Sequence, residues 1–523
     1  MKTRERDRTR PGPLATDPDR IRLLLARLDR AVHVIAAPAG PAVSLDPVPG
    51  RRVLATLGPL PPRALGSPDF RAAHGTDTAY MAGGMAGAIS SVGLVAAAAR
   101  AGFLAVFGAG GLTPDAVRSA LVRLGTRLPA RPYAVSLLHT PTEQALERSV
   151  VELFLNHGVR CVEASAYLDL TPHLVRYRVA GLRRGPDGRA YAGNRVIAKA
   201  SRPEVCGRFL LPPPEDLVAG LLAQGLITAE QAGLAREMPM ADDLTVEADS
   251  AGHTDRRPLS ALLPVVARQR DELHRRHPNL PLVRLGAAGG IGTPRAVAAA
   301  LALGADYVVT GSVNQACVEA GTAERTRRLL ATAGVSDFDM APSGYQFELG
   351  AQVQVLRRGT MFPQRARRLR RMYESCGGLE ELTADDRAWL EGQIFRRPLE
   401  EVWAEVVGFF AARDPGVVER AAADPKRRMA LTFRWYLGLS SKWAVTGDPE
   451  RAADYQIWAG PALGGFNDWV RDTYLAEPGN RRIADVAHHL LYGAAFHTRA
   501  AALQHAGVRL PAGCLDYVPA PLS

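Results

Sequence analysis

The sequence predicts an α/β fold built on a closed barrel of eight parallel strands, and three observations point to it. Short apolar runs end in Gly, Ser or Thr, and each run is followed by a helical pattern. Eight such runs lie between residues 79 and 310, and eight strands close a (β/α)8 TIM barrel. The chain has 523 residues, whereas such a barrel uses roughly 250, so further segments are expected.

The expected strands are short and are separated by segments of helix length. They are Ala79–Ala82, Phe103–Phe107, Tyr133–Leu138, Cys161–Ala164, Arg195–Ala200, Leu244–Ala248, Leu282–Ala287 and Tyr307–Thr310. Two of the helices that follow them are marked by capping boxes, in which Thr140 pairs with Glu143 and Ser201 pairs with Glu204.

The chain divides by composition into three parts. We expect an N-terminal extension over residues 1–74, the barrel over 75–325 and a C-terminal helical subdomain over 326–523. Residues 211–240 are too many for a simple connection between strands, and their apolar spacing predicts a small helical insertion. All six Trp lie in the C-terminal part.

The charge balance favours an acidic partner. Lys and Arg number 64 against 53 Asp and Glu, which gives a net charge of +11. The basic residues are spread along the chain, so nucleic-acid binding is not expected. The five Cys lie far apart without metal-ligand spacing, so neither a disulfide framework nor a metal site is indicated. No apolar stretch reaches about 18 residues, so we expect no membrane insertion and a cytoplasmic protein.

Glycine-rich turns follow three of the expected strands. Met81, Ala82 and Gly83 end the first strand, where a backbone poor in side chains lets a flat ligand approach closely. The alternative is a tight turn without a ligand. Since a barrel carries its active site on the loops after its strands, such turns are the first candidates for binding.

The turns after the seventh and eighth strands have the pattern of a phosphate cradle. Gly289 and Gly290 follow the seventh strand, and Gly311 and Ser312 follow the eighth. Each turn leads into a helix, and the free N–H groups there point at an anion. Plain connecting turns are the alternative.

Three polar residues at strand ends are further candidates. His253 follows the sixth strand through a Gly-containing turn and could act as a general acid near neutral pH. Lys199 lies near the end of the fifth strand, where its cation could hold a ring or a phosphate, or else form a salt bridge, for example with Glu163. Ser136 ends the third strand, either as a ligand contact or as a polar strand end.

These motifs resemble the superfamily of nitronate monooxygenases and FabK-type enoyl reductases, whose members bind FMN in a (β/α)8 barrel. The C-terminal region carries the resemblance further, to the PfaD family of trans-acting enoyl reductases. The segments that carry it are Met81-Ala82-Gly83-Gly84, Ala251-Gly252-His253, Gly289-Gly290-Ile291, Thr310-Gly311-Ser312, Met340-Ala341-Pro342, Val355–Phe362, Gly460-Pro461 and Gly465–Trp469.

The resemblance implies a role for each candidate. The phosphate of FMN would be held by Gly289, Gly290, Gly311 and Ser312, and its ring would be lined by Met81, Ala82 and Gly83. His253 would protonate the α-carbon of an enoyl thioester after hydride reaches the β-carbon. The sequence departs from the family pattern twice, with Ala251 in place of a Gly and Ser136 in place of an Asn.

The resemblance also implies partners and leaves rival functions open. The electron donor would be NADPH or NADH, the substrate would be carried by an acidic acyl carrier protein in polyketide or polyunsaturated fatty acid biosynthesis, and a homodimer is possible. The rivals are a nitronate monooxygenase, a non-catalytic flavin-binding component of a synthase complex, and a phosphate-binding barrel without flavin.

Overall fold

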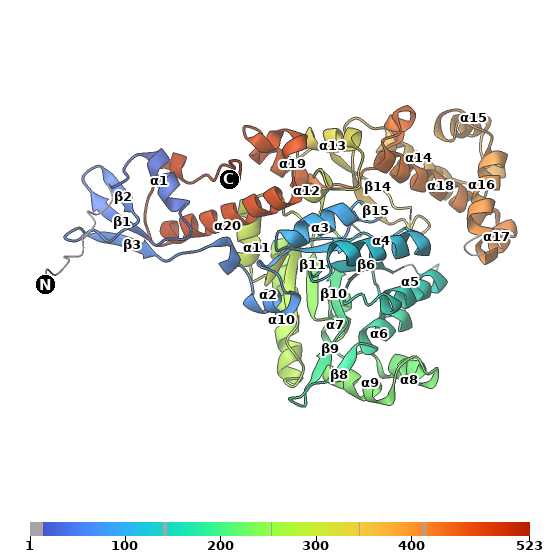
Figure 1. The fold of residues 1–523 in the computed structure, drawn as a ribbon. Coiled ribbons are helices and arrows are strands. Elements are labelled where there is room, and N and C mark those ends of the chain that lie inside the picture. The colour runs from blue at the N-terminus through green and yellow to red at the C-terminus, as the bar shows by residue number, and fades with distance from the viewer. Residues whose placement is uncertain (1–13, 140–143, 253, 345, 412–414, 523) are drawn as a thin grey trace.

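The computed structural model describes residues 14–139, 144–252, 254–344, 346–411 and 415–522. A barrel lies at its centre, between a group of N-terminal strands on one side and C-terminal helices on the other (Figure 1). This arrangement places most of the chain outside the barrel around its two flanks.

Eight parallel strands close into one barrel, which confirms the predicted fold class. Every strand overlaps the run expected for it. They are β4 (Tyr80–Ala82), β5 (Leu104–Phe107), β6 (Ala134–Leu138), β7 (Cys161–Ser165), β10 (Arg195–Ala200), β11 (Asp243–Glu247), β12 (Arg284–Ala288) and β13 (Tyr307–Thr310). Because the strands are parallel, all eight carboxyl ends meet at one rim, where a barrel of this kind carries its site.

Helices cover the outside of the barrel, and apolar faces hold them there. They are α3 (Val92–Arg100), α4 (Pro114–Arg127), α5 (Gln144–Asn156), α6 (Pro172–Val179), α7 (Pro203–Leu210), α10 (Leu259–Arg276), α11 (Pro294–Ala302) and the short α12 (Ser312–Gln315). Helix α2 (Pro68–His74) instead places Phe70 in the cluster of the barrel interior, stacked on Tyr307 of β13. The capping box expected at Ser201 is wrong, because Ser201 Oγ donates to Asp255 Oδ2 at 2.9 Å instead of capping α7. The box expected at 140–143 lies outside the described residues.

Two additions interrupt the alternation of strands and helices. A hairpin of β8 (Leu182–Arg184) and β9 (Ala190–Ala192) precedes β10 and was not expected from the sequence. Within residues 211–240, helices α8 (Glu215–Ala223) and α9 (Ala229–Leu234) form the helical insertion. Helix α8 packs on α6 and α9 packs on β8, so both additions extend the same flank of the barrel.

The C-terminal region is mainly helical, as expected, and it also contains two strands that the sequence did not predict. A hairpin of β14 (Phe338–Pro342) and β15 (Gln352–Leu356) lies within it. No helix among the described residues is both long enough and apolar enough to cross a membrane. The helices are α13 (Glu324–Ala331), α14 (Phe362–Ser375), α15 (Ala384–Trp389), α16 (Leu399–Ala411), α17 (Pro415–Ala422), α18 (Pro425–Thr446), α19 (Pro461–Trp469) and α20 (Ile483–His505).

Helix α20 joins the N-terminal strands to the barrel (Figure 1). One stretch of it packs on α11 of the barrel, and another packs on a small N-terminal cluster. Arg499, near its end, donates to four backbone carbonyl oxygens of residues 25, 27, 30 and 58. The N-terminal elements are helix α1 (Pro18–Leu25) and an antiparallel sheet ordered β2 (Gly40–Ser44), β1 (Val32–Ala37), β3 (Val53–Leu57).

Candidate active site at the carboxyl end of the barrel

The turn after β4 lies close to its neighbouring strands. Gly83 N donates to Thr310 O of β13 at 3.0 Å, and Gly84 N donates to Glu163 Oε2 of β7 at 3.2 Å. A Cβ atom on Gly84 would stand 2.6 Å from that same carboxylate oxygen. Met81 and Ala82 are fully buried, and Met81 packs in the barrel interior. The turn therefore needs glycine at position 84, because the Glu163 carboxylate occupies the space of a side chain there.

Three charged side chains meet below this turn. Lys199 Nζ of β10 lies 3.8 Å from Glu163 Oε2 and 3.7 Å from Glu247 Oε1 of β11. Glu163 is fully buried, and its Oε1 atom has no hydrogen-bond partner among the described residues. The salt bridge with Glu163, one of the two interpretations of Lys199 that the sequence left open, is present.

Burial and the mutual charges of this cluster shift two of its pKa values. Burial raises the pKa of Glu163, and the nearby Glu247 adds to that rise while Lys199 partly offsets it. Burial by itself would lower the pKa of Lys199, but the two carboxylates outweigh it and raise that pKa above its ordinary value. The cation at Lys199 is therefore held charged inside the barrel rim.

Sequence reasoning missed Glu163 and Glu247 as site residues. Each is the one acidic residue near the end of an otherwise apolar or neutral run, in Cys161–Ser165 and in Leu244–Glu247. A carboxylate in a strand that is buried on both faces must be paired. A lone acidic residue in such a strand was therefore the signal in the sequence. It indicates a buried cation on a neighbouring strand.

Ser136 lies in the middle of β6 and holds the turn after β5. Its Oγ accepts hydrogen bonds from Ala109 N at 2.9 Å and from Gly110 N at 3.4 Å, and the residue is 8% exposed. The hydroxyl oxygen is thus engaged with the neighbouring loop of the chain. A contact between Ser136 and a ligand stays a prediction.

The two turns of the predicted phosphate cradle lie side by side, because β12 and β13 are paired. Gly289 and Gly290 have φ of +90° and +72°, in the left-handed region that favours glycine. A Cβ on Gly289 would stand 2.8 Å from Asp249 O, while one on Gly290 would meet nothing within 4 Å. The Oγ of Ser312, which follows Gly311, accepts from Gly460 N at 3.2 Å.

His253 lies outside the described residues. The loop that carries it leaves β11 and is held together on either side of that position. Asp249 N donates to Arg257 O at 3.1 Å, and Thr254 Oγ1 donates to Ala248 O at 3.0 Å. Ser250 Oγ donates to Glu247 Oε1 at 2.9 Å, which ties this loop to the cluster around Lys199.

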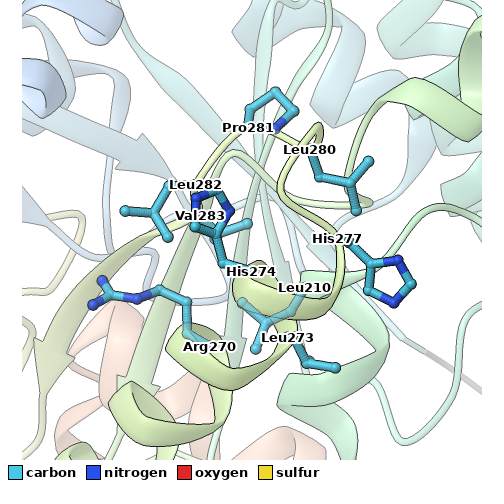
Figure 2. Close-up of a pocket in the computed structure, with 9 residues that line it drawn as sticks. All are labelled: Leu210, Arg270, Leu273, His274, His277, Leu280, Pro281, Leu282 and Val283. Atoms are coloured by element: carbon cyan, nitrogen blue, oxygen red, sulfur yellow. The ribbon is translucent and has the colours of Figure 1, made fainter.

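Two hollows lie away from the candidate residues. The hollow in Figure 2 has a volume of about 10 Å³ and is lined by residues such as Leu210, Arg270 and Val283, the last of which lies just before β12. It is therefore at the amino end of the strands and has room for about one water molecule. The other, of about 340 Å³, lies beside the β14–β15 hairpin and is lined partly by Arg357 and Arg367.

Known proteins similar to this chain share both the barrel and the C-terminal region. Residues 72–346 match the family described as nitronate monooxygenase, and residues 376–455 match the inserted helical domain of [acyl-carrier-protein] S-malonyltransferase. The enoyl reductase domain of MlnA, from the macrolactin cluster of Bacillus amyloliquefaciens, is a solved structure with 35% sequence identity and a TM-score of 0.79. That match covers 84% of this chain and 98% of the MlnA domain.

The first family match spans more than half of the chain. The chain belongs to the nitronate monooxygenase family. Among curated relatives, a polyunsaturated fatty acid synthase polypeptide of Thraustochytrium is 43% identical over 90% of this chain, and polyketide biosynthesis protein PksE of Bacillus subtilis is 42% identical over 82% of it. The matched segments are 32% and 56% of those two proteins, so the chain spans only part of their length. The family resemblance seen in the sequence is confirmed.

Proposed function

We propose that this chain is an FMN-dependent enoyl reductase. It would reduce the 2,3 double bond of enoyl thioesters on an acyl carrier protein with NADPH or NADH, in polyketide or polyunsaturated fatty acid biosynthesis. The observation that carries the proposal is the likeness to the MlnA enoyl reductase domain, nearly all of which this chain covers at 35% identity. The names of the fatty acid and polyketide relatives support the same pathway class.

The residues at the rim fit an FMN molecule. A Cβ on Gly290 would meet nothing within 4 Å, so the backbone at this position is open to a ligand, while Gly289 packs closely on the β11 loop at Asp249 O. Glu163 Oε1 is a buried acceptor without a partner among the described residues. We assign the phosphate to Gly289, Gly290, Gly311 and Ser312, and the ring to the turn that follows Met81, Ala82 and Gly83.

The chemistry that such a cofactor supplies when bound is hydride transfer from a reduced nicotinamide to the β-carbon of the enoyl thioester. The side chains of the protein would supply the proton and the fixed charge that the reaction also needs. We assign to His253 the proton that reaches the α-carbon, because an imidazole exchanges protons near neutral pH. Lys199, held charged between two carboxylates, would place a fixed cation beside the ring.

The carrier-protein partner is proposed from charge and from the relatives. The net charge of +11 suits an acidic carrier protein, since complementary charge speeds association. The match of residues 376–455 to a helical domain of an acyl-carrier-protein transferase adds a second link to carrier-protein chemistry.

The proposal is tested by incubating the purified protein with NADPH and a crotonyl thioester on a carrier protein. Reduction adds two hydrogens, so mass spectrometry of the acyl group is expected to show a gain of about 2 Da only when both reactants are present. No mass gain with a flavin-loaded, folded protein would contradict the proposal.

A second candidate is a nitronate monooxygenase, which the family match itself favours. That reaction consumes oxygen and an alkyl nitronate without a nicotinamide. An oxygen electrode with propyl nitronate therefore separates the two functions: oxygen uptake that needs no NADPH, together with no reduction of the enoyl thioester, would favour the monooxygenase.

A further inference from the structure

Two segments of the C-terminal region lie against the predicted phosphate cradle. From β15, Gln354 Nε2 donates to Asp249 Oδ1 of the β11 loop at 2.9 Å. From the start of α19, Gly460 N donates to Ser312 Oγ of the β13 loop at 3.2 Å. Both segments lie beyond residue 346, outside the part of the chain that matches the nitronate monooxygenase family. The cradle is therefore bordered by residues that the family barrel does not supply.

Close backbone packing completes this border. A Cβ on Gly292 of the β12 loop would collide with the backbone of Ala462, and a Cβ on Gly289 would stand 2.8 Å from Asp249 O. The β11 loop contacts Gln354, and the β13 loop contacts Gly460. The β12 loop packs on Ala462 and on the β11 loop. The two segments thus form an outer wall along the cradle.

Gln354 places an unused acceptor in this wall. The residue is 8% exposed, and its Oε1 atom is buried without a hydrogen-bond partner among the described residues. The orientation of the amide is fixed, because the Asp249 carboxylate accepts and so requires the NH₂ group. A buried acceptor left unpaired is unfavourable, and such groups in folded proteins normally have a partner.

None of the neighbouring residues that the structure describes donates a hydrogen bond to Gln354 Oε1. Gly460 lies next to Gln354 Oε1, close enough that a Cβ on Gly460 would stand 2.5 Å from the oxygen. The N–H of Gly460 already donates to Ser312 Oγ. A ligand in the cradle that carries a hydroxyl or N–H group would supply the missing donor.

We propose that the C-terminal segments close the cofactor site and that Gln354 Oε1 accepts a hydrogen bond from a hydroxyl of the flavin's ribityl chain. The inference rests on the proposed function. A phosphate held in the cradle offers acceptors, and the ring is assigned to the turn at Gly83. The hydroxyl-bearing chain that joins ring and phosphate is the part of the cofactor that carries donors beside the cradle.

The test compares three flavins on flavin-free protein by quenching of flavin fluorescence. FMN and riboflavin carry the ribityl hydroxyls, whereas lumiflavin has neither hydroxyls nor phosphate. Gln354→Met is expected to weaken the binding of FMN and of riboflavin by the same factor, roughly two- to tenfold for one hydrogen bond. Lumiflavin binding is expected to be unchanged.

Two more variants serve as a second test and as a control. Gly460→Ala pushes the Gln354 side chain aside without removing it and is expected to reproduce the hydroxyl-dependent loss. Gln352→Met, at the exposed start of the same strand, is expected to bind all three flavins as the wild type does. An equal loss for all three flavins, or no loss for any, would overturn the inference. Failure of the wild type to bind any flavin would refute the proposed function itself, and the inference with it.

Discussion

Lys199 is the residue on which the electrostatics of the rim depend. Its ammonium group lies within 4 Å of two carboxylates, of which Glu163 is fully buried. The sequence indicated the pairing with Glu163 but not that with Glu247, because the order of strands around the barrel is needed to bring three side chains from β7, β10 and β11 together. Removing the cation leaves a buried negative charge, which folded proteins tolerate poorly.

We predict that Lys199→Met lowers the free energy of unfolding by about 3 kcal/mol near pH 8 and by less near pH 5. Without the cation, the pKa of Glu163, already raised by burial, rises further. A carboxyl whose pKa is higher in the folded state stabilises the fold below its unfolded pKa of about 4.3, and that contribution is lost as pH rises through the folded pKa. Urea unfolding at the two pH values measures the difference.

The matched control for this prediction is the double variant Lys199→Met/Glu163→Gln, which removes the buried charge together with its partner. Its deficit in unfolding free energy is expected to be smaller and to change little between pH 5 and pH 8. A deficit of Lys199→Met that is the same at both pH values would show that the lost interaction is packing and not charge.

Among the elements, the glycine turns after β4, β12 and β13 were predictable and their surroundings were not. Glycines directly after strands mark the turns in the sequence. What stands opposite each glycine depends on a distant segment, such as Asp249 O opposite Gly289 or Ala462 opposite Gly292. The β14–β15 hairpin was missed for a related reason, because its short strands lie in a region whose other segments have helical periodicity.

We predict that Gly289→Ala destabilises the protein by about 3 kcal/mol, because a left-handed φ and a collision with Asp249 O both oppose a Cβ. The comparison is Gly304→Ala, which has φ of +97° but nothing within 4 Å of the new methyl group, so about 1 kcal/mol is expected there from strain alone. Chemical unfolding curves report both values. Equal destabilisation by the two variants would mean that the β12 loop adapts to the methyl group.

For the molecule as a whole, the barrel was predictable and the way its flanks are joined was not. Apolar runs and helix spacing indicated eight strands in order, since each strand and its helix are local in sequence. The link between the chain ends is not local: Arg499 of α20 donates to carbonyl oxygens of residues 25, 27, 30 and 58. Periodicity carries no information about such a contact, because a buried Arg on a helix has the same sequence pattern as an exposed one.

We predict that Arg499→Met loosens the N-terminal sheet while the barrel stays folded, because four carbonyl oxygens lose their donor. Thermolysin is expected to cleave within residues 14–60 roughly tenfold faster or more, since cleavage follows the population of the opened form. Mass spectrometry identifies the fragments. Arg118→Met, which breaks an exposed pair with Asp115 on α4, is the control and should cleave at the wild-type rate. Early cuts within the barrel of the Arg499 variant would contradict this account.

The central claim is that the rim of this barrel binds flavin and passes hydride to an enoyl thioester. An anaerobic absorbance titration tests it directly. NADPH is added to the flavin-loaded protein, and an enoyl thioester on a carrier protein follows. We predict that the flavin absorbance bleaches with NADPH and returns on addition of the thioester without oxygen. Bleached flavin that recovers its colour only when oxygen is admitted would contradict the claim.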